Sequence, residues 1–346
     1  MNRTGKSRRG LKNLPVAAAL TGMALSGVAL TVAGCGGGGT PAAGAPPATY
    51  HAAAEQAAVT RWLVKTNQMW TRDDFAGLDQ VTTGQMRTIY LSEQRRMSLP
   101  TNADRVGFQL TGLSITVPCH TGTGRPAVFV AYADTDVFDL GTGMQPVAMV
   151  FQRTGGHWKL ATAVTHPRGQ GWPSLCTTGA PPATPLVLAT GSYTPGLAQV
   201  LTGVATGTPQ TAPAAAPFTV NDFLAGPGSI PAQFANSIRQ DRRRGVNFTA
   251  RFGLAPDPTF ALPLAAGRGY WVIGTMTQTD TYTAPAGLRA ADWPDGSPVA
   301  TPRPAVVHHE TDTFTTTYTA IDPPRSGYAT VTLNGFSGWP LTATAS

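Results

Sequence analysis

Apolar residues recur at helical spacing in two stretches that follow residue 50. The first stretch predicts a helix with one buried stripe, made of Val59, Trp62, Leu63, Thr66 and Trp70. A polar turn at residues 71–80 separates it from a second helical stripe that ends before Pro100, made of Met86, Ile89, Tyr90 and Met97. The chain therefore begins its folded part with helices.

The pattern then changes to that of strands. Three strand-forming stretches follow, at residues 108–119, 126–139 and 146–164, and the last contains a Thr-Gly-Gly turn at residues 154–156. Helices followed by an antiparallel meander predict an α+β domain over residues 48–178.

The second half of the chain repeats this order. A Pro-rich and low-complexity linker at residues 179–217 precedes helical signals at residues 220–244. Four strand-like stretches follow, at residues 244–254, 268–284, 305–321 and 327–336. The closing segments also agree, since GHWKLATA at residues 156–163 resembles GWPLTATA at residues 338–345. We therefore expect an α+β fold of two tandem domains, each with helices followed by an antiparallel sheet, the second over residues 218–346.

The start of the chain carries a targeting signal. Residues 1–14 hold five basic and no acidic residues, and residues 15–32 are small and mostly apolar. The sequence Val-Ala-Gly-Cys that ends at Cys35 resembles the lipobox of bacterial lipoproteins. That resemblance implies a signal peptide at residues 1–34, acyl chains such as palmitate on Cys35, and a Gly/Pro-rich tether at residues 35–47. A retained signal anchor is the alternative, and the segment at residues 7–12 leaves twin-arginine and general export both open.

Charge adds little once the signal is set aside. The full chain has a formal charge of +7, and the signal accounts for five of these charges, so the mature chain retains +2. This small balance argues against nucleic acid as a partner. Only 12% of the residues are charged, about half the usual share, and Gly and Pro are abundant, as in secreted actinobacterial proteins.

The chain has three cysteines. If Cys35 carries lipid, Cys119 and Cys176 remain as an even pair in an exported protein. The expected result is a disulfide between them.

The first half resembles the nuclear transport factor two-like superfamily. The residues that carry the resemblance are Trp62, Trp70, the segment DDFAGLDQ at residues 73–80 and the segment HWKL at residues 157–160. The resemblance implies a sheet curved into a cone that can hold a ligand, so the fold it implies for the chain is two tandem cone-like domains, each with helices followed by a curved antiparallel sheet. Some relatives use an acid or a histidine in the cone for isomerisation or dehydration.

One polar cluster and two threonine arrays stand out in the second half. His308, Glu310 and Asp312 alternate on one strand and would share a face, where they could bind a metal or transfer protons. A solvent-facing polar strand edge is the alternative, and we favour it because same-face neighbours lie roughly 6.6 Å apart.

The arrays are Thr275, Thr277, Thr279 and Thr281 on one face and Thr311, Thr313, Thr315 and Thr317 on another. Such arrays bind ice or glycans in some proteins, but the explanation we favour is structural, because threonine prefers half-exposed strands of a twisted sheet and pairs well across them.

Two further segments bear on partners. Trp293 lies in a long Pro-rich connection at residues 284–304 and is a candidate partner contact. The arginines before Gly245 could touch anionic headgroups, but we favour a helix C-terminus closed by that glycine.

The chain contains no zinc-protease, phosphate-loop, dinucleotide or nucleophile-elbow motif.

The expectation is a lipid-anchored protein at the extracytoplasmic face of the cell membrane, without cofactor or metal. It would act as a non-catalytic binding or scaffold module for an envelope protein or a small apolar ligand. The alternative is an isomerase or dehydratase-like enzyme with a cone-shaped pocket. A transport-system binding protein fits less well, because those proteins alternate strands and helices.

Overall fold

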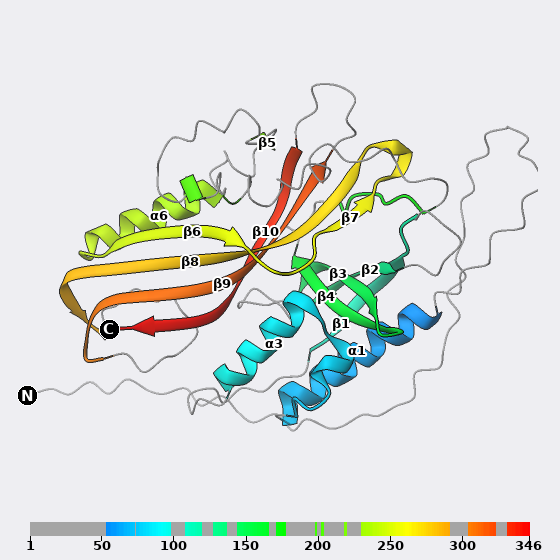
Figure 1. Ribbon diagram of the computed structural model, residues 1–346, viewed down its shortest axis with the longest axis horizontal. Helices are drawn as coiled ribbons and strands as arrows, with labels where there is room; N and C mark the ends of the chain where they lie inside the picture. The colour runs from blue at the N-terminus through cyan, green and yellow to red at the C-terminus, as the bar shows by residue number, and fades with distance from the viewer. Residues whose placement is uncertain are drawn as a thin grey trace, which may run out of the picture. The chain divides into compact units, whose positions relative to one another are not determined.

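The computed structural model describes most of the chain beyond the targeting segment (Figure 1). The described residues are 53–72, 74–97, 108–119, 127–136, 144–165, 171–177, 198, 202–203, 218–219, 230–290, 304–322 and 331–346. The predicted signal peptide, the tether with Cys35, most of the predicted linker and Trp293 lie outside these residues. Residues 50–346 form one compact unit.

Three helices precede the first sheet, namely α1 (Ala53–Arg72), α2 (Leu78–Val81) and α3 (Gly84–Met97). The two predicted helices are confirmed as α1 and α3. The stripe of α1 is confirmed in part, since Val59, Trp62 and Thr66 are buried while Leu63 and Trp70 are half-buried. The short helix α2 lies where the pattern predicted only a turn.

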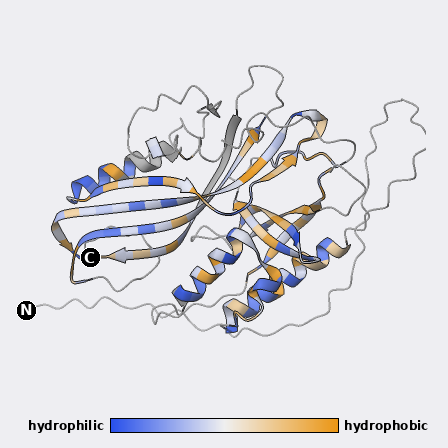
Figure 2. Cartoon of the chain, viewed as in Figure 1, coloured by the Kyte–Doolittle hydropathy of each residue, from blue (hydrophilic) through white to orange (hydrophobic). Residues whose placement is uncertain are grey.

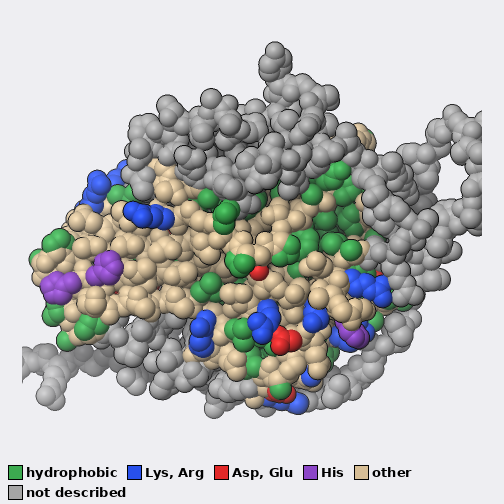
Figure 3. Space-filling model, in the orientation of Figure 1, with side chains coloured by type: hydrophobic (Ala, Val, Ile, Leu, Met, Phe, Trp, Pro, Cys, Tyr) green, Lys and Arg blue, Asp and Glu red, His purple; other side chains and the backbone are tan. Residues whose placement is uncertain are grey.

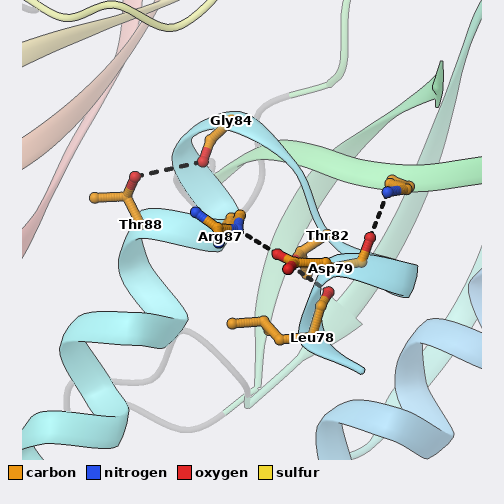
Figure 4. A network of polar contacts seen from close by, with 7 residues as sticks. Leu78, Asp79, Thr82, Gly84, Arg87 and Thr88 are labelled. Atoms are coloured by element: carbon orange, nitrogen blue, oxygen red, sulfur yellow. Dashed lines mark hydrogen bonds and ion pairs between the residues drawn. The ribbon is translucent and has the colours of Figure 1, made fainter. Parts of the chain in front are cut away.

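An exposed network holds the corner between α2 and α3 (Figure 4). Arg87 donates to the carboxylate of Asp79, and the Nζ of Lys159 donates to the backbone carbonyl of the same aspartate. The Arg87 guanidinium lowers the pKa of the Asp79 carboxyl below its ordinary value. Thr82 closes α2 by donating from Oγ1 to the carbonyl of Leu78 at 2.8 Å. These contacts fix the start of α3 over strand β4.

The first sheet has four antiparallel strands in the order β1-β2-β3-β4. Their bounds are β1 (Leu110–Thr116), β2 (Val128–Thr135), β3 (Gln145–Thr154) and β4 (His157–Thr165). The predicted hairpin turn is confirmed, because Gly155 and Gly156 take the positive φ values of 59° and 83° that join β3 to β4. One face of this sheet packs against α1 and α3 in a core that includes Trp62, Met86 and Phe151.

The second sheet has six strands in the order β5-β10-β9-β8-β6, with β7 paired to β8. Their bounds are β5 (Phe218–Thr219), β6 (Asn247–Leu254), β7 (Phe260–Pro263), β8 (Tyr270–Arg289), β9 (Val306–Asp322) and β10 (Val331–Ala345). The pairings are antiparallel except the two-residue pairing of β5 with β10. A short 3-10 turn, η2 (Ala265–Gly267), lies between β7 and β8.

Helix α6 (Ile230–Arg243) packs against one face of this sheet through Ile238, next to Phe248 and Tyr282. The predicted helix end is confirmed. Gly245 has a φ of 80° and its N–H donates to the carbonyl of Arg242 at 3.1 Å.

The other face of the first sheet packs on the second sheet. Val130 and Val150 of the first sheet share a buried cluster with Leu262, Trp271 and Ile273 of the second. These contacts are apolar and fully buried, so the two sheets stabilise each other.

The predicted disulfide is confirmed between Cys119 and Cys176, whose Cα atoms lie 5.3 Å apart. The backbone N–H of Cys176 also donates to Pro263 at 2.8 Å, which ties this bridge to β7. Closing a loop of 57 residues stabilises the folded chain by about 4 kcal/mol in the chain-entropy estimate.

The predicted α+β fold of two tandem cone-like domains is wrong. More of the described residues lie in strands than in helices, and the described part holds four helices and two antiparallel sheets of different size. Among the described elements, α1, α2 and α3 accompany the four-stranded sheet and α6 accompanies the six-stranded sheet, and the two sheets differ in strand number and strand order. Local periodicity marks where helices and strands lie, but the pairing of long strands such as β8 and β9 decides the architecture.

Candidate functional site

The predicted polar cluster does not converge on one point. Glu310 and Asp312 are 1% and 0% exposed, whereas His308 is exposed at the start of β9. Among the residues that the structure describes, no three His, Cys, Asp or Glu side chains are placed to hold a metal ion. The two acids instead belong to a buried acidic region of the six-stranded sheet.

In that region, Asp280 of β8 lies directly opposite Asp312 of β9, and Tyr282 lies opposite Glu310. The Gln278 amide donates to both carboxylate oxygens of Asp280, at 3.0 and 3.1 Å. Burial raises the pKa of Asp280 to about 6, with the amide bond acting in the opposite direction.

The pKa of Tyr282 is also shifted by this buried acidic region. Burial raises the pKa of its phenol, and the carboxylates of Asp280, Asp312, Asp241 and Glu310 raise it further. Burial likewise raises the pKa of Asp241 at the end of α6. The side chains of this region pack beside the apolar cluster that Ile238 of α6 joins.

The opposite face of the same strands carries the threonines. Thr275, Thr277, Thr279 and Thr281 of β8 lie directly opposite Thr317, Thr315, Thr313 and Thr311 of β9. The prediction of two separate faces is therefore wrong, because the register stacks both arrays on one face. We call this surface the threonine face.

The inner half of the threonine face is buried against α3 and β4. Thr315 and Thr317 are 3% and 2% exposed. Gln85 of α3 donates from Nε2 to Thr315 Oγ1 at 3.1 Å, and its Oε1 accepts from Thr317 at 2.9 Å and from Thr162 of β4 at 2.5 Å. One buried amide is thus held by three threonine hydroxyls.

The outer half of the threonine face is open to solvent and spans four strands. Two rows cross β6, β8, β9 and β10, and we call them the outer threonine rows. The first row is Thr249, Thr281, Thr311 and Thr344, and the second is Arg251, Thr279, Thr313 and Thr342. The members on β6 and β10 are exposed and those on β8 and β9 are half-buried. Arg251 is the one charged residue in the two rows.

Figures 2 and 3 agree with a polar but mostly uncharged surface on the six-stranded sheet. Figure 2 colours β8 and β9 pale over much of their length, between the hydrophilic and hydrophobic extremes. In Figure 3, the left part of the molecule, where Figure 1 places the six-stranded sheet, is mostly tan, the colour of the backbone and of side chains that are neither apolar nor charged.

The outer rows present a regular pattern of hydroxyl and methyl groups. Neighbouring strands lie about 4.8 Å apart, and same-face residues along a strand lie about 6.7 Å apart. The hydroxyls of Thr279, Thr281 and Thr313 form no hydrogen bond with another described residue. Each hydroxyl can both donate and accept. The rows can therefore bind an uncharged ligand rich in hydroxyl or amide groups.

His309 borders the first row. Its ring nitrogens lie 3.1 Å from Thr311 Oγ1 and 3.4 Å from Thr283 Oγ1. Sequence reasoning chose His308 of this pair, although strand alternation in HHETDT already places His309 with the threonines.

Sequence reasoning also missed Gln85, Thr249 and the two threonines of β10. The alternation in NFTARFG and in LTATA was a signal for the last three. Nothing local marked Gln85, because its partners lie far away in the chain. Trp62 is a core residue as predicted, and Trp158 packs half-buried against the same cluster.

Comparison of the chain with protein-family models, with curated proteins and with solved structures gives no match. Within the described residues, none of the helices has the length and apolar character that a membrane span requires. The chemistry of the described surfaces is therefore what indicates the function.

Proposed function

We propose that this protein is a binding module of the bacterial cell envelope, and that the outer threonine rows are its binding surface. Lipid on Cys35 would hold it at the extracytoplasmic face of the cell membrane, and its role would be non-catalytic. The supporting observation is the alignment of seven threonines and one arginine in two rows across four strands, on a face open to solvent.

Structural preference alone explains threonine on a strand, but not this arrangement. A half-exposed strand tolerates lysine, glutamate, serine or tyrosine at its outward positions. Here β8 and β9 together hold eight paired threonines without a charged residue among them. A surface selected only for solubility would carry charges, as most protein surfaces do.

The enzymatic alternative depended on a cone-shaped pocket. The predicted cone is replaced by two packed sheets, and the acids that were candidates for proton transfer, Glu310 and Asp312, are buried. Hydroxyl rows on the solvent-facing side of a sheet are suited to holding an extended partner, whereas conversion of a small substrate usually takes place in an enclosing pocket.

The test is sedimentation of the mature protein, kept in detergent micelles, with native cell walls from which the membrane lipids have been extracted, so that the lipid on Cys35 cannot carry the protein into the pellet. The variant Thr281→Val/Thr311→Val keeps the branched side chains and removes two hydroxyls from the first row. The control is Thr111→Val, the same change at an exposed position of β1. Loss of two hydrogen bonds predicts binding weaker by about tenfold for the double variant only. Equal binding of the double variant and the parent would overturn the proposal.

A further inference from the structure

We propose that the outer threonine rows bind an uncharged polymer of N-acetylated amino sugars. This inference rests on the proposed function and names the ligand of the same surface. It follows from what the buried half of the threonine face already binds.

Gln85 shows how this face holds an amide. Its carboxamide oxygen accepts from Thr317, and its nitrogen donates to Thr315, the neighbouring same-face position of β9. Neither charge nor a backbone group takes part in these contacts. Two threonines that lie two residues apart on β9 thus bind this amide, one as donor and one as acceptor, and Thr162 of β4 adds a second donor.

The same arrangement continues into solvent. β9 carries Thr313 and Thr311 at the next same-face positions, paired with Thr279 and Thr281 of β8 in unbroken register. The outer rows thus offer to an external amide the two β9 hydroxyls of that pattern, with the hydroxyls of β8 beside them in place of Thr162. The continuity of one face from the buried interface to the open surface is the main argument for an amide-bearing ligand.

Charge and shape narrow the ligand class further. The outer rows contain no acidic residue and one cation, Arg251, at their β6 edge. A polycation would find no carboxylate there, and a polyanion would find a single positive charge. The rows extend across four strands, about 14 Å, which suits an extended chain rather than a compact molecule.

An acetamido sugar polymer combines the required groups. Its acetamide matches the Gln85 carboxamide, its hydroxyls match the remaining threonine hydroxyls, and its methyl groups and ring faces can pack on threonine methyls. A polymer of plain sugars has the hydroxyls without the amide, and a deacetylated polymer replaces the amide with a positive charge. These two polymers are therefore the informative comparisons.

The experiment measures binding of the full mature chain in detergent micelles to three soluble β-linked hexamers by titration calorimetry. The probes are hexamers of N-acetylglucosamine, glucosamine and glucose. We expect the acetylated hexamer to bind at least about tenfold more tightly than the other two, as for one lost amide interaction with two hydrogen bonds. Equal binding of the glucose hexamer, or no binding of the acetylated hexamer, would overturn the inference.

Variants separate this inference from the proposed function. Thr281→Val/Thr311→Val should weaken binding of the acetylated hexamer about tenfold, and Thr111→Val should leave it unchanged. Thr342→Val, at an exposed position of β10, gives a second variant that does not disturb β8 or β9. If cell-wall sedimentation depends on these hydroxyls while none of the hexamers binds, the ligand is wrong and the binding surface stands. If the variants alter neither measurement, both proposals fail.

Discussion

Gln85 of helix α3 donates a hydrogen bond to Thr315 of strand β9 at 3.1 Å, across 230 positions of the sequence. Together with the bonds from Thr162 and Thr317, it links the helix, the first sheet and the second sheet at one buried amide. A side chain that joins three elements so far apart stabilises their relative placement, because each partner would otherwise be a buried polar group without a bond.

Replacement of this amide should therefore be costly. Gln85→Leu leaves three buried threonine hydroxyls without their partner and should lower the free energy of unfolding by about 2–4 kcal/mol. Urea denaturation followed by tryptophan fluorescence measures the change. Gln94→Leu, at an exposed position of the same helix, is the control and should change stability by less than about 0.5 kcal/mol. Equal stabilities for the two variants would contradict the role assigned to Gln85.

The buried Asp280 predicts a dependence of stability on pH. Its pKa is about 6 in the folded chain and about 3.9 in an unfolded one, so the unfolded chain loses this proton first as the pH rises. Stability should fall between about pH 4 and pH 6, by about 3 kcal/mol, and then level off.

The variant Asp280→Asn isolates this contribution from the neighbouring carboxyls of Asp241, Glu310 and Asp312. The amide cannot ionise. The decrease in the free energy of unfolding between pH 4 and pH 6, measured by urea denaturation, should therefore be smaller by about 3 kcal/mol in this variant. Asp134→Asn, at an exposed position of β2, should keep the slope of the parent. An undiminished slope in Asp280→Asn would show that another group carries the dependence.

Gly274 of β8 lies directly opposite Tyr318 of β9, and its lack of a side chain makes room for the tyrosine. A Cβ at this position would overlap the Tyr318 ring, so Gly274→Ala should destabilise the protein by about 1–3 kcal/mol. The double variant Gly274→Ala/Tyr318→Leu should regain part of the lost stability, which thermal melting measures.

Gly338→Ala is the matched control, because its added Cβ would meet Thr316 Oγ1 at an ordinary 3.7 Å. This change should have little effect on the melting temperature. A Gly274→Ala protein as stable as the control would mean that the tyrosine does not occupy the space above the glycine.

The lipid anchor is tested by Cys35→Ala. The variant should escape acylation and signal cleavage, and it should no longer incorporate labelled palmitate. Cell fractionation with metabolic labelling makes the comparison with the parent. If the variant is still processed and still fractionates with lipid as the parent does, Cys35 is not the site of lipid attachment.

Signals that act over short distances were sufficient to predict several elements. The helices α1 and α3, the Gly155–Gly156 turn and the end of α6 at Gly245 are confirmed, and the buried stripe of α1 is confirmed in part, because each depends on neighbouring residues. The disulfide was predictable from cysteine number and export alone.

The sheets were not predictable, and the threonines show why. Because threonine recurs at every second position in β8 and β9, sliding one strand by two residues still places threonine opposite threonine. The register depends on unique contacts such as Gly274 against Tyr318, which no periodic pattern reveals. The similar closing segments were equally misleading about architecture, since Trp158 and Trp339 pack against one shared core rather than two separate ones.

Nuclear magnetic resonance can show whether the outer threonine rows are the binding surface. The protein would carry isotope-labelled threonine methyl groups and be titrated with soluble fragments of the native cell wall. We expect the methyl signals of Thr281, Thr311 and Thr342 to shift and that of Thr111 of β1 to stay unchanged. Shifts confined to the first sheet, with the outer rows unaffected, would show that the ligand binds elsewhere.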